Sequence, residues 1–325
     1  MMLNGADQNH WEAGLIGRGE SHDSIKEADD RAFGELVERY VFWEGINLYH
    51  GIPSDSANLF LPSWEHPYTD AFENAYTFSD YGCLPVFDHK EALSGYCPVE
   101  MVFPNDKSVD LFWSSNGWSY GDGDINSSLL ELIERDFLLR WWYGRNSVRW
   151  QIKEIIQPHL RELHTKFFVY SKNIRLVGTN DDIFIAFAAR ISDRYPFLSV
   201  GSAARLNKSA AEQKAVLEAI ALTKFASEWL LTGQHKYGDD LIIANSIRSF
   251  CYPDAKDHLL DLMGYVGADQ IEPYDIKKFR YMRFNPPIST GTPRVVLKGF
   301  YEGAIPLLSP LRETLSKFSP HHPLP

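Results

Sequence analysis

The sequence contains little cysteine and no long apolar run. Its 325 residues include only three cysteines, which are scattered and form no CxxC pair, so neither a disulfide framework nor a zinc site is predicted. No apolar stretch approaches the ~18 residues that a membrane-spanning helix needs, and the N-terminus lacks the basic and apolar regions of a signal peptide. These absences predict a soluble, cytoplasmic protein.

Positive charge is also in short supply. The 32 lysine and arginine residues are outnumbered by 43 aspartate and glutamate residues, which gives a formal net charge of -11. Proteins that bind duplex nucleic acid need clustered positive charge, so this balance argues against that class. It remains compatible with a nucleotide ligand, because a bound metal ion reverses the local sign of the charge.

Three stretches of the chain share one order of features, a turn segment rich in glycine or serine followed by a helix that carries glutamates. The turn segments are 14–19, 114–123 and 201–204, and the helices are expected over about 25–43, 125–142 and 209–231. Further helices are expected over 148–164 and 257–264, and strands over 96–103, 111–114, 166–171, 183–191, 195–200 and 294–301. This mixture predicts an α+β fold with mixed β-sheets.

One short phrase occurs twice, as ELVER at 35–39 and as ELIER at 131–135. Two carboxylates three residues apart lie on nearly the same face of a helix. Two such helices brought together would direct four carboxylates, Glu35, Glu38, Glu131 and Glu134, at one small volume. Because like charges cannot share a site without compensation, a divalent cation such as Mg²⁺ with phosphate oxygens is the expected partner. A solvated helix face with short-range ion pairs is the alternative interpretation of each copy.

The glycine-rich segments contain neither a P-loop nor a GxGxxG motif, so no standard nucleotide fold is indicated by motif. Backbone N–H groups at a helix start can still bind anions. Arg39 and Arg135 end the two phrases. Their guanidinium groups could orient the glutamates or contact phosphate oxygens, since arginine suits both by its bidentate fork.

Three blocks of the sequence resemble the YcaO family. The first, within 17–40, combines GRG with ELVERY and is similar to that family's GKG…ExxER segment. The second, within 114–136, combines SSNG with ELIERD and is the most specific match, to SSNGLAxG…ExIERD. The third, within 201–219, pairs GxA with AVLEA. The resemblance implies a single YcaO-type domain over 1–325, with the motifs in 14–231 and a C-terminal strand and proline-rich tail over 286–325.

The resemblance also implies cofactors and an activity. It implies ATP and Mg²⁺, with the metal held by Glu35, Glu38, Glu131, Glu134 and Glu218. These glutamates would also line the nucleotide site, together with Arg18, Ser21, Arg39, Ser115, Asn116 and Arg135. The implied reaction is an attack on a peptide carbonyl by a neighbouring Cys, Ser or Thr side chain. ATP phosphorylates the amide oxygen, and loss of phosphate leaves an azoline.

The C-terminus refines this expectation. Residues 320–325 read PHHPLP, similar to the proline-rich PxPxP ending of peptide cyclodehydratases in the family. Such a stiff tail could place Pro325 near the reacting amide. The implied catalytic residues are Glu134, Arg135 and Pro325. A disordered tail is the alternative.

Some positions depart from the family pattern. Arg18 stands where the family has lysine, Arg31 stands where it has a small serine, and the stretch from Gly121 to Glu131 is shortened. A non-catalytic scaffold subunit of a modification complex therefore stays open as an alternative function. A second alternative is a YcaO enzyme that uses the same ATP chemistry with another nucleophile to form thioamides or amidines, and the proline-rich terminus favours azolines over these products.

The expected partners follow from the same resemblance. The substrate would be a ribosomal precursor peptide. A chain of 325 residues holds little beyond the YcaO domain, so a separate ubiquitin-activating-enzyme-like subunit is expected to recruit the peptide. A flavin dehydrogenase could join the complex. No nucleic-acid or membrane partner is expected.

Overall fold

The computed structural model describes residues 25–53, 58, 81–99, 102–103, 117–155, 165–193, 197–232, 253–265, 267–287 and 294–304. Contacts divide them into two compact units. The first takes its described residues from Leu15–Asp136 and Asp275–Ser309, and the second from Phe137–Tyr274. A single domain over 1–325 stays a prediction. Within the ranges above, no helix is long and apolar enough to cross a membrane.

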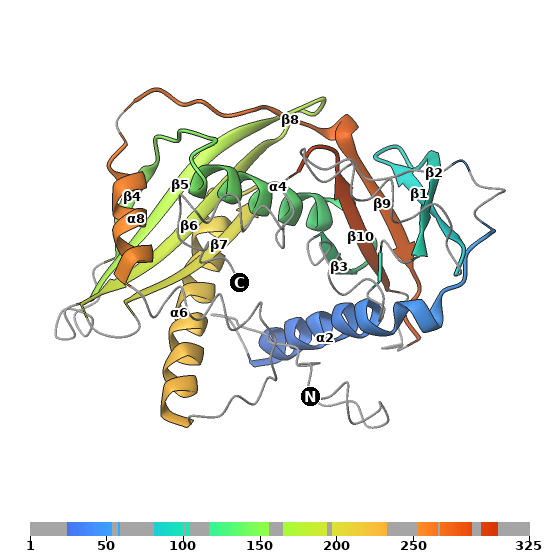
Figure 1. The fold of residues 1–325 in the computed structure, drawn as a ribbon, viewed down its shortest axis with the longest axis horizontal. Coiled ribbons are helices and arrows are strands. Elements are labelled where there is room, and N and C mark those ends of the chain that lie inside the picture. The colour runs from blue at the N-terminus through green and yellow to red at the C-terminus, as the bar shows by residue number, and fades with distance from the viewer. Residues whose placement is uncertain are drawn as a thin grey trace. The chain divides into compact units, whose positions relative to one another are not determined.

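The first unit is built on an antiparallel sheet with the strand order β2-β1-β9-β10-β3. Its elements are α2 (Ile25–Leu48), β1 (Cys83–Asp88), β2 (Leu93–Pro98), β3 (Trp118–Gly121), η4 (Ile276–Lys278), β9 (Phe279–Phe284) and β10 (Val295–Tyr301). Helix α2 packs on the edge strand β3 and on its neighbour β10 (Figure 1).

Aromatic side chains hold α2 against this sheet. The ring centroids of Phe42 on α2 and Trp118 on β3 lie 5.6 Å apart. Trp118 lies 5.9 Å from Phe284 on β9, and Phe103 lies 5.2 Å from the same ring. Aromatic pairs at such distances add to the free energy of area burial, so the position of α2 depends on these rings.

The second unit contains a second antiparallel sheet, whose main path runs β4-β5-β6-β7. Its elements are β4 (Gln151–Glu154), β5 (Thr165–Val177), β6 (Asp182–Ser192), β7 (Leu198–Arg205), α6 (Lys208–Thr232) and α8 (Pro253–Met263). The short β8 (Tyr274–Asp275) lies where the chain passes from the second unit back to the first. Asn207 caps α6, since its Oδ1 accepts a hydrogen bond from the backbone N–H of Ala210 at 3.0 Å.

Small residues let α6 lie close against β7. Ala203 on β7 and Ala211, Ala215 and Ala219 on α6 are fully buried. A Cβ atom added at Gly201 would stand 2.2 Å from the carbonyl oxygen of Ala215 and 2.4 Å from the nitrogen of Ala219. Gly201 is therefore required by the close approach of a helix backbone to a strand.

Helix α4 (Ile125–Trp142) runs from the first unit into the second. Asp124 caps it, with Oδ1 accepting a hydrogen bond from the N–H of Asn126 at 3.0 Å. Buried side chains lie on all sides of the helix, as expected of a helix enclosed by protein. In the second unit, Trp141 packs edge-on against Phe187 of β6, with ring centroids 5.4 Å apart.

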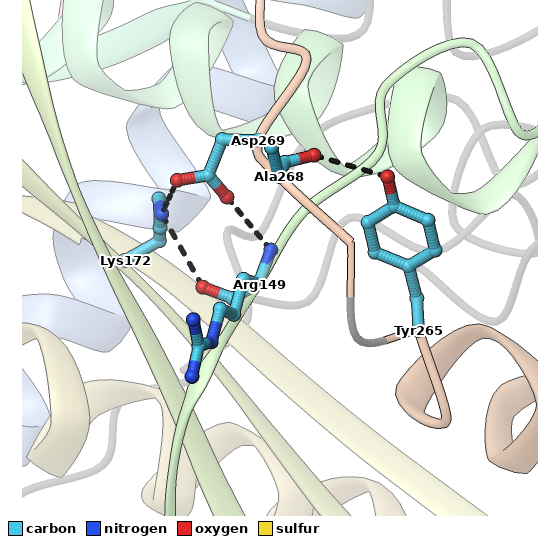
Figure 2. A network of polar contacts seen from close by, with 5 residues as sticks. All are labelled: Arg149, Lys172, Tyr265, Ala268 and Asp269. Atoms are coloured by element: carbon cyan, nitrogen blue, oxygen red, sulfur yellow. Dashed lines mark hydrogen bonds and ion pairs between the residues drawn. The ribbon is translucent and has the colours of Figure 1, made fainter.

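A polar network fastens the segment after α8 to β5. Asp269 accepts hydrogen bonds from the backbone N–H of Arg149 at 2.8 Å and from the ammonium of Lys172. Lys172 also donates to the carbonyl of Arg149 at 3.3 Å, and the Tyr265 hydroxyl donates to the carbonyl of Ala268 at 3.0 Å (Figure 2). Burial opposes ionisation of Asp269, but these hydrogen bonds outweigh it and lower its pKa. The network thus fixes the path of the chain towards β8.

The α+β fold class and most helix predictions are confirmed. The prediction of mixed sheets is wrong for the described residues, because the strands along both main sheets pair antiparallel. The helix predicted over 125–142 coincides with α4, and the one over 209–231 lies within α6. The helix predicted over 25–43 continues to Leu48, and the one over 257–264 corresponds to α8. Strands predicted over 166–171, 183–191 and 294–301 correspond to β5, β6 and β10.

Several local predictions are wrong. Residues 201–204, predicted as a turn segment, belong to β7, and residues 118–121 within another predicted turn form β3. Residues 151–154 of the predicted helix 148–164 form β4, because they pair in register with β5. The strand predicted over 96–103 occurs instead as β2, and the one over 111–114 lies outside the described residues.

Replacing Gly201 by alanine is expected to lower the free energy of unfolding by about 1–3 kcal/mol, because the new methyl group must displace the α6 backbone. Urea denaturation measures the change. Gly121→Ala is the matched control, since a Cβ at Gly121 meets nothing within 4 Å. Equal losses in the two variants would contradict the close packing of α6.

Candidate nucleotide and metal site

The first phrase of the repeat directs one glutamate at the sheet and one at the surface. Glu38 Oε1 accepts a hydrogen bond from the backbone N–H of Tyr120 at 2.7 Å. Tyr120 lies on β3, an edge strand, and a carboxylate is a strong acceptor for an N–H that points away from the ladder. Glu35 instead pairs with Arg39 one turn along α2, where both side chains are partly exposed.

Glu218 makes the same kind of contact in the second unit. Its Oε2 accepts a hydrogen bond from the backbone N–H of Ser202 on β7 at 3.2 Å. Its Oε1 lies 3.2 Å from Nζ of Lys214, one turn earlier on α6. The absence of a side chain at Gly201 brings the helix close enough for this bond. Glu218 is therefore anchored to the strand that it covers.

Glycines dock the first half of α4 on the sheet of the first unit. Gly117 has a φ of +76°, and a Cβ there would stand 2.9 Å from Cγ of Leu132. Its carbonyl oxygen accepts two hydrogen bonds, from Ser128 Oγ at 2.6 Å and from the N–H of Gly299 at 2.7 Å. A Cβ at Gly299 would stand 2.2 Å from Ser128 Oγ. Gly117 is the last residue of the SSNG segment. The geometry therefore explains why this position needs a glycine.

The second phrase lies on α4, where charged residues are unusually buried. Glu134 is 4% exposed and Asp136 is 2% exposed. The Glu134 Oε1 atom lies 3.9 Å from Nε of Arg135. Glu131 is only partly buried. Burying a charged side chain costs free energy unless the charge is compensated. The buried carboxylates of this helix therefore indicate a functional or structural role.

Not all of the predicted site can be placed. Arg18, Ser21, Ser115, Asn116 and Pro325 lie outside the described residues. In the ranges that the structure does describe, no three His, Cys, Asp or Glu side chains form a group that could hold a metal ion. Glu218 lies in the second unit and the other four glutamates in the first. The five-glutamate metal set therefore stays a prediction.

Lys298 is a fully buried cation that the sequence did not reveal. It lies on β10, 2% exposed, with Nζ 5.5 Å from the ring centroid of Trp118 and 5.3 Å from that of Phe300. Burial lowers the pKa of its ammonium from 10.5 to about 7, although the charges of Glu131 and Cys97 oppose this shift. The desolvation of the ammonium thus outweighs its favourable contacts.

Sequence reasoning also missed Ser128 and Tyr120. Ser128 lies three residues before Glu131, so helical spacing could have placed it on the same face. The role of Tyr120 depends on strand register, in which it pairs with Val296 of β10. No local signal in the sequence carries that pairing.

The chain matches the family model described as YcaO cyclodehydratase, ATP- and Mg²⁺-binding, over residues 23–271. That range spans most of the chain and includes α2, α4 and α6. The protein therefore belongs to the YcaO family. The resemblance stated from the motifs is confirmed, and ATP with Mg²⁺ agrees with the description of the family. No curated protein matches the chain.

Solved structures share the fold. A chain of the E. coli microcin synthetase McbBCD complex with pro-MccB17 bound superposes with a TM-score of 0.59 at 13% identity, covering 87% of this chain and 81% of that one. The YcaO from Methanopyrus kandleri bound with AMPPCP and Mg²⁺ gives a TM-score of 0.52 at 15% identity, covering 89% and 82%. At such low identity the likeness shows the fold.

The stability of the protein is expected to depend on the protonation of Lys298. Its pKa in the folded state is lower than in the unfolded chain, so the unfolded chain binds more protons between pH 7 and 10.5. The free energy of unfolding gains a contribution that rises through this window, by at most about 1.4 kcal/mol per pH unit. Lys298→Met should remove that rise in denaturant titrations at several pH values. Lys90→Met, at an exposed lysine of the same unit, should retain it, and identical profiles for the two variants would contradict the assignment.

Proposed function

We propose that this chain is an ATP-dependent cyclodehydratase that converts Cys, Ser or Thr residues of a ribosomal precursor peptide into azolines. One observation carries the proposal. A single family model described as a cyclodehydratase matches residues 23–271, a range that includes the three glutamate-bearing helices. The fold neighbours described above are consistent with it.

The residues present suit the chemistry of Mg²⁺. This ion prefers oxygen ligands and usually takes only one or two carboxylates, with substrate phosphates and water completing its shell. Glu131 is partly buried and Glu134 lies one turn further along the same helix. We assign metal binding first to these two, because they lie one turn apart on one face of α4, in the sequence block that is the most specific match to the family pattern. Bound Mg²⁺ would supply positive charge to the phosphates of ATP.

The proposed reaction removes one water equivalent from the peptide. The side-chain sulfur or oxygen forms a bond to the carbonyl carbon of the preceding residue and gives up its proton. The former carbonyl oxygen takes the terminal phosphoryl group of ATP, which releases ADP. The carbon–oxygen bond then breaks, phosphate leaves, and loss of the amide proton gives the carbon–nitrogen double bond of the azoline.

The chain contributes positioning and charge to this reaction. Glu134 and Arg135 are proposed as catalytic residues, because they lie on a largely buried helix where charge interactions are strong. Arg39 and Arg135 can offer bidentate forks to phosphate oxygens. Arg18, Ser21, Ser115 and Asn116 are proposed as further nucleotide contacts, and Pro325 as a group near the reacting amide.

The proposed partners are those of a modification complex. The substrate is a precursor peptide, which a separate ubiquitin-activating-enzyme-like subunit would recruit, and a flavin dehydrogenase could oxidise the azoline. The neighbour from E. coli was solved as the McbBCD complex with pro-MccB17, which supports an assembly of this kind.

Calorimetry with Mg²⁺ and the ATP analogue AMPPCP tests the nucleotide site. The wild type is expected to bind with micromolar affinity, and Glu131→Gln combined with Glu134→Gln should weaken binding by about a hundredfold, because both metal-binding carboxylates lose their charge. Glu154→Gln, at an exposed position on β4, is the matched control and should bind as the wild type does.

Failure of the wild type to bind, alone or with its partner subunit, would instead favour the scaffold function. Binding that survives in the double variant would remove these two glutamates from the site and leave the nucleotide assignment to other residues.

Removal of residues 323–325 tests whether the product is an azoline. If the proline-rich tail lies at the reacting amide, the deletion should abolish ring formation and leave nucleotide affinity unchanged. Co-expression with a candidate precursor peptide and partner subunit, followed by mass spectrometry, would reveal each ring as the loss of one water. A truncated chain that modifies the peptide at full rate would favour thioamide or amidine formation.

A further inference from the structure

Two cations on one face of the first sheet each lie over an aromatic ring of β3. The guanidinium carbon of Arg294 lies 5.5 Å from the ring centroid of Tyr120, and Nζ of Lys298 lies 5.5 Å from that of Trp118. In the strand pairing, Val296 lies opposite Tyr120 and Lys298 opposite Trp118. The two cations differ in burial, since Lys298 is enclosed and Arg294 is exposed. Arg294 alone can reach a dissolved ligand.

Tyr120 connects Arg294 to the first glutamate phrase. Its backbone N–H donates to Glu38 at 2.7 Å. Its ring meets that of Phe33 on α2 edge-on, with centroids 6.1 Å apart. A Cβ at Gly34 would stand 3.4 Å from Cδ1 of Tyr120. Arg294 therefore lies beside the segment of α2 that carries the ELVER phrase.

Contact with the Tyr120 ring prepares the Arg294 guanidinium for an anion. An arginine held over an aromatic ring has less side-chain freedom to lose on binding, and its planar fork offers several N–H donors. In the part of the chain that the structure describes, Arg294 forms no ion pair.

Arg283 on the neighbouring strand β9 provides a contrast. It belongs to the same sheet and its side chain is 43% exposed, but it forms an ion pair with Glu91 at 3.8 Å. The ion pair with Glu91 is sufficient to explain an arginine at position 283. Arg294 has an aromatic support in place of a carboxylate, which favours recognition of an external anion.

We propose that Arg294, supported by the ring of Tyr120, binds a phosphate group of the nucleotide beside the first glutamate phrase. This inference deepens the proposed function and rests on it. Bidentate hydrogen bonds from one guanidinium to phosphate oxygens would add positive charge beside the nucleotide.

The test compares the binding of two compounds. AMPPCP, in the presence of Mg²⁺, carries phosphates and is measured by calorimetry. Adenosine carries no phosphate and is measured by competition against a fluorescent adenosine analogue. Arg294→Ala is expected to weaken AMPPCP binding by about tenfold or more and to leave adenosine binding unchanged. Arg294→Lys should recover only part of the loss, because an ammonium lacks the planar fork. Arg283→Ala is the matched control and should bind both compounds as the wild type does.

Other outcomes overturn the inference. An Arg294→Ala variant that binds AMPPCP like the wild type, or that loses both compounds equally, shows that Arg294 does not contact phosphate. If that variant fails to fold, Tyr120→Leu removes the aromatic ring beneath Arg294 and keeps the guanidinium. A selective loss for AMPPCP then supports the inference, and equal or absent losses overturn it. A wild type that binds neither compound overturns the proposed function and this inference together, whereas a wild type that binds them leaves the function standing whatever Arg294 does.

Discussion

A hydrogen bond from an edge strand to a helix glutamate is the contact on which both units depend. The outermost strand of a sheet turns some of its N–H groups away from the ladder, and they need an acceptor. Glu38 supplies one to Tyr120, and Glu218 supplies one to Ser202. In each case a helix must approach a strand closely, which the sequence permits with small residues such as Gly201. The glutamates that the motifs single out thus already serve the fold.

The sequence predicts the helices well because each carries its own signals. Asp124 and Asn207 cap α4 and α6 where the sequence places the helix starts. The predictions fail where residues distant in the sequence determine the local structure. The glycine, serine and alanine residues at 201–204 favour a turn locally, but they form a strand because β6 pairs with them and α6 needs their small size. Likewise, the grouping of Tyr120 with Arg294 depends on strand register, which no local pattern encodes.

Helix α4 shows why the candidate site could be predicted only in part. The helix predicted over 125–142 is confirmed as α4. The burial of Glu134 and Asp136 could not be predicted, because charged residues at such spacing are usually solvated. Their enclosure results from packing on every side of the helix, which itself depends on Gly117 and Gly299 admitting Ser128. Close packing at glycines thus sets the electrostatic environment of the second phrase.

The order of the strands in the first sheet has a consequence for synthesis of the chain. β9 and β10 lie between β1 and β3 in space, but they follow the whole segment Phe137–Tyr274 in sequence. A ribosome therefore completes the contiguous segment of the second unit before the two strands that join the first sheet emerge. Until then, the β1–β2 pair and β3 lack the two strands that join them, and a long loop must be closed to complete the sheet. The apolar and aromatic surface of α2 consequently remains exposed for most of translation, which makes the first unit the part of this protein that is vulnerable to aggregation before folding is complete.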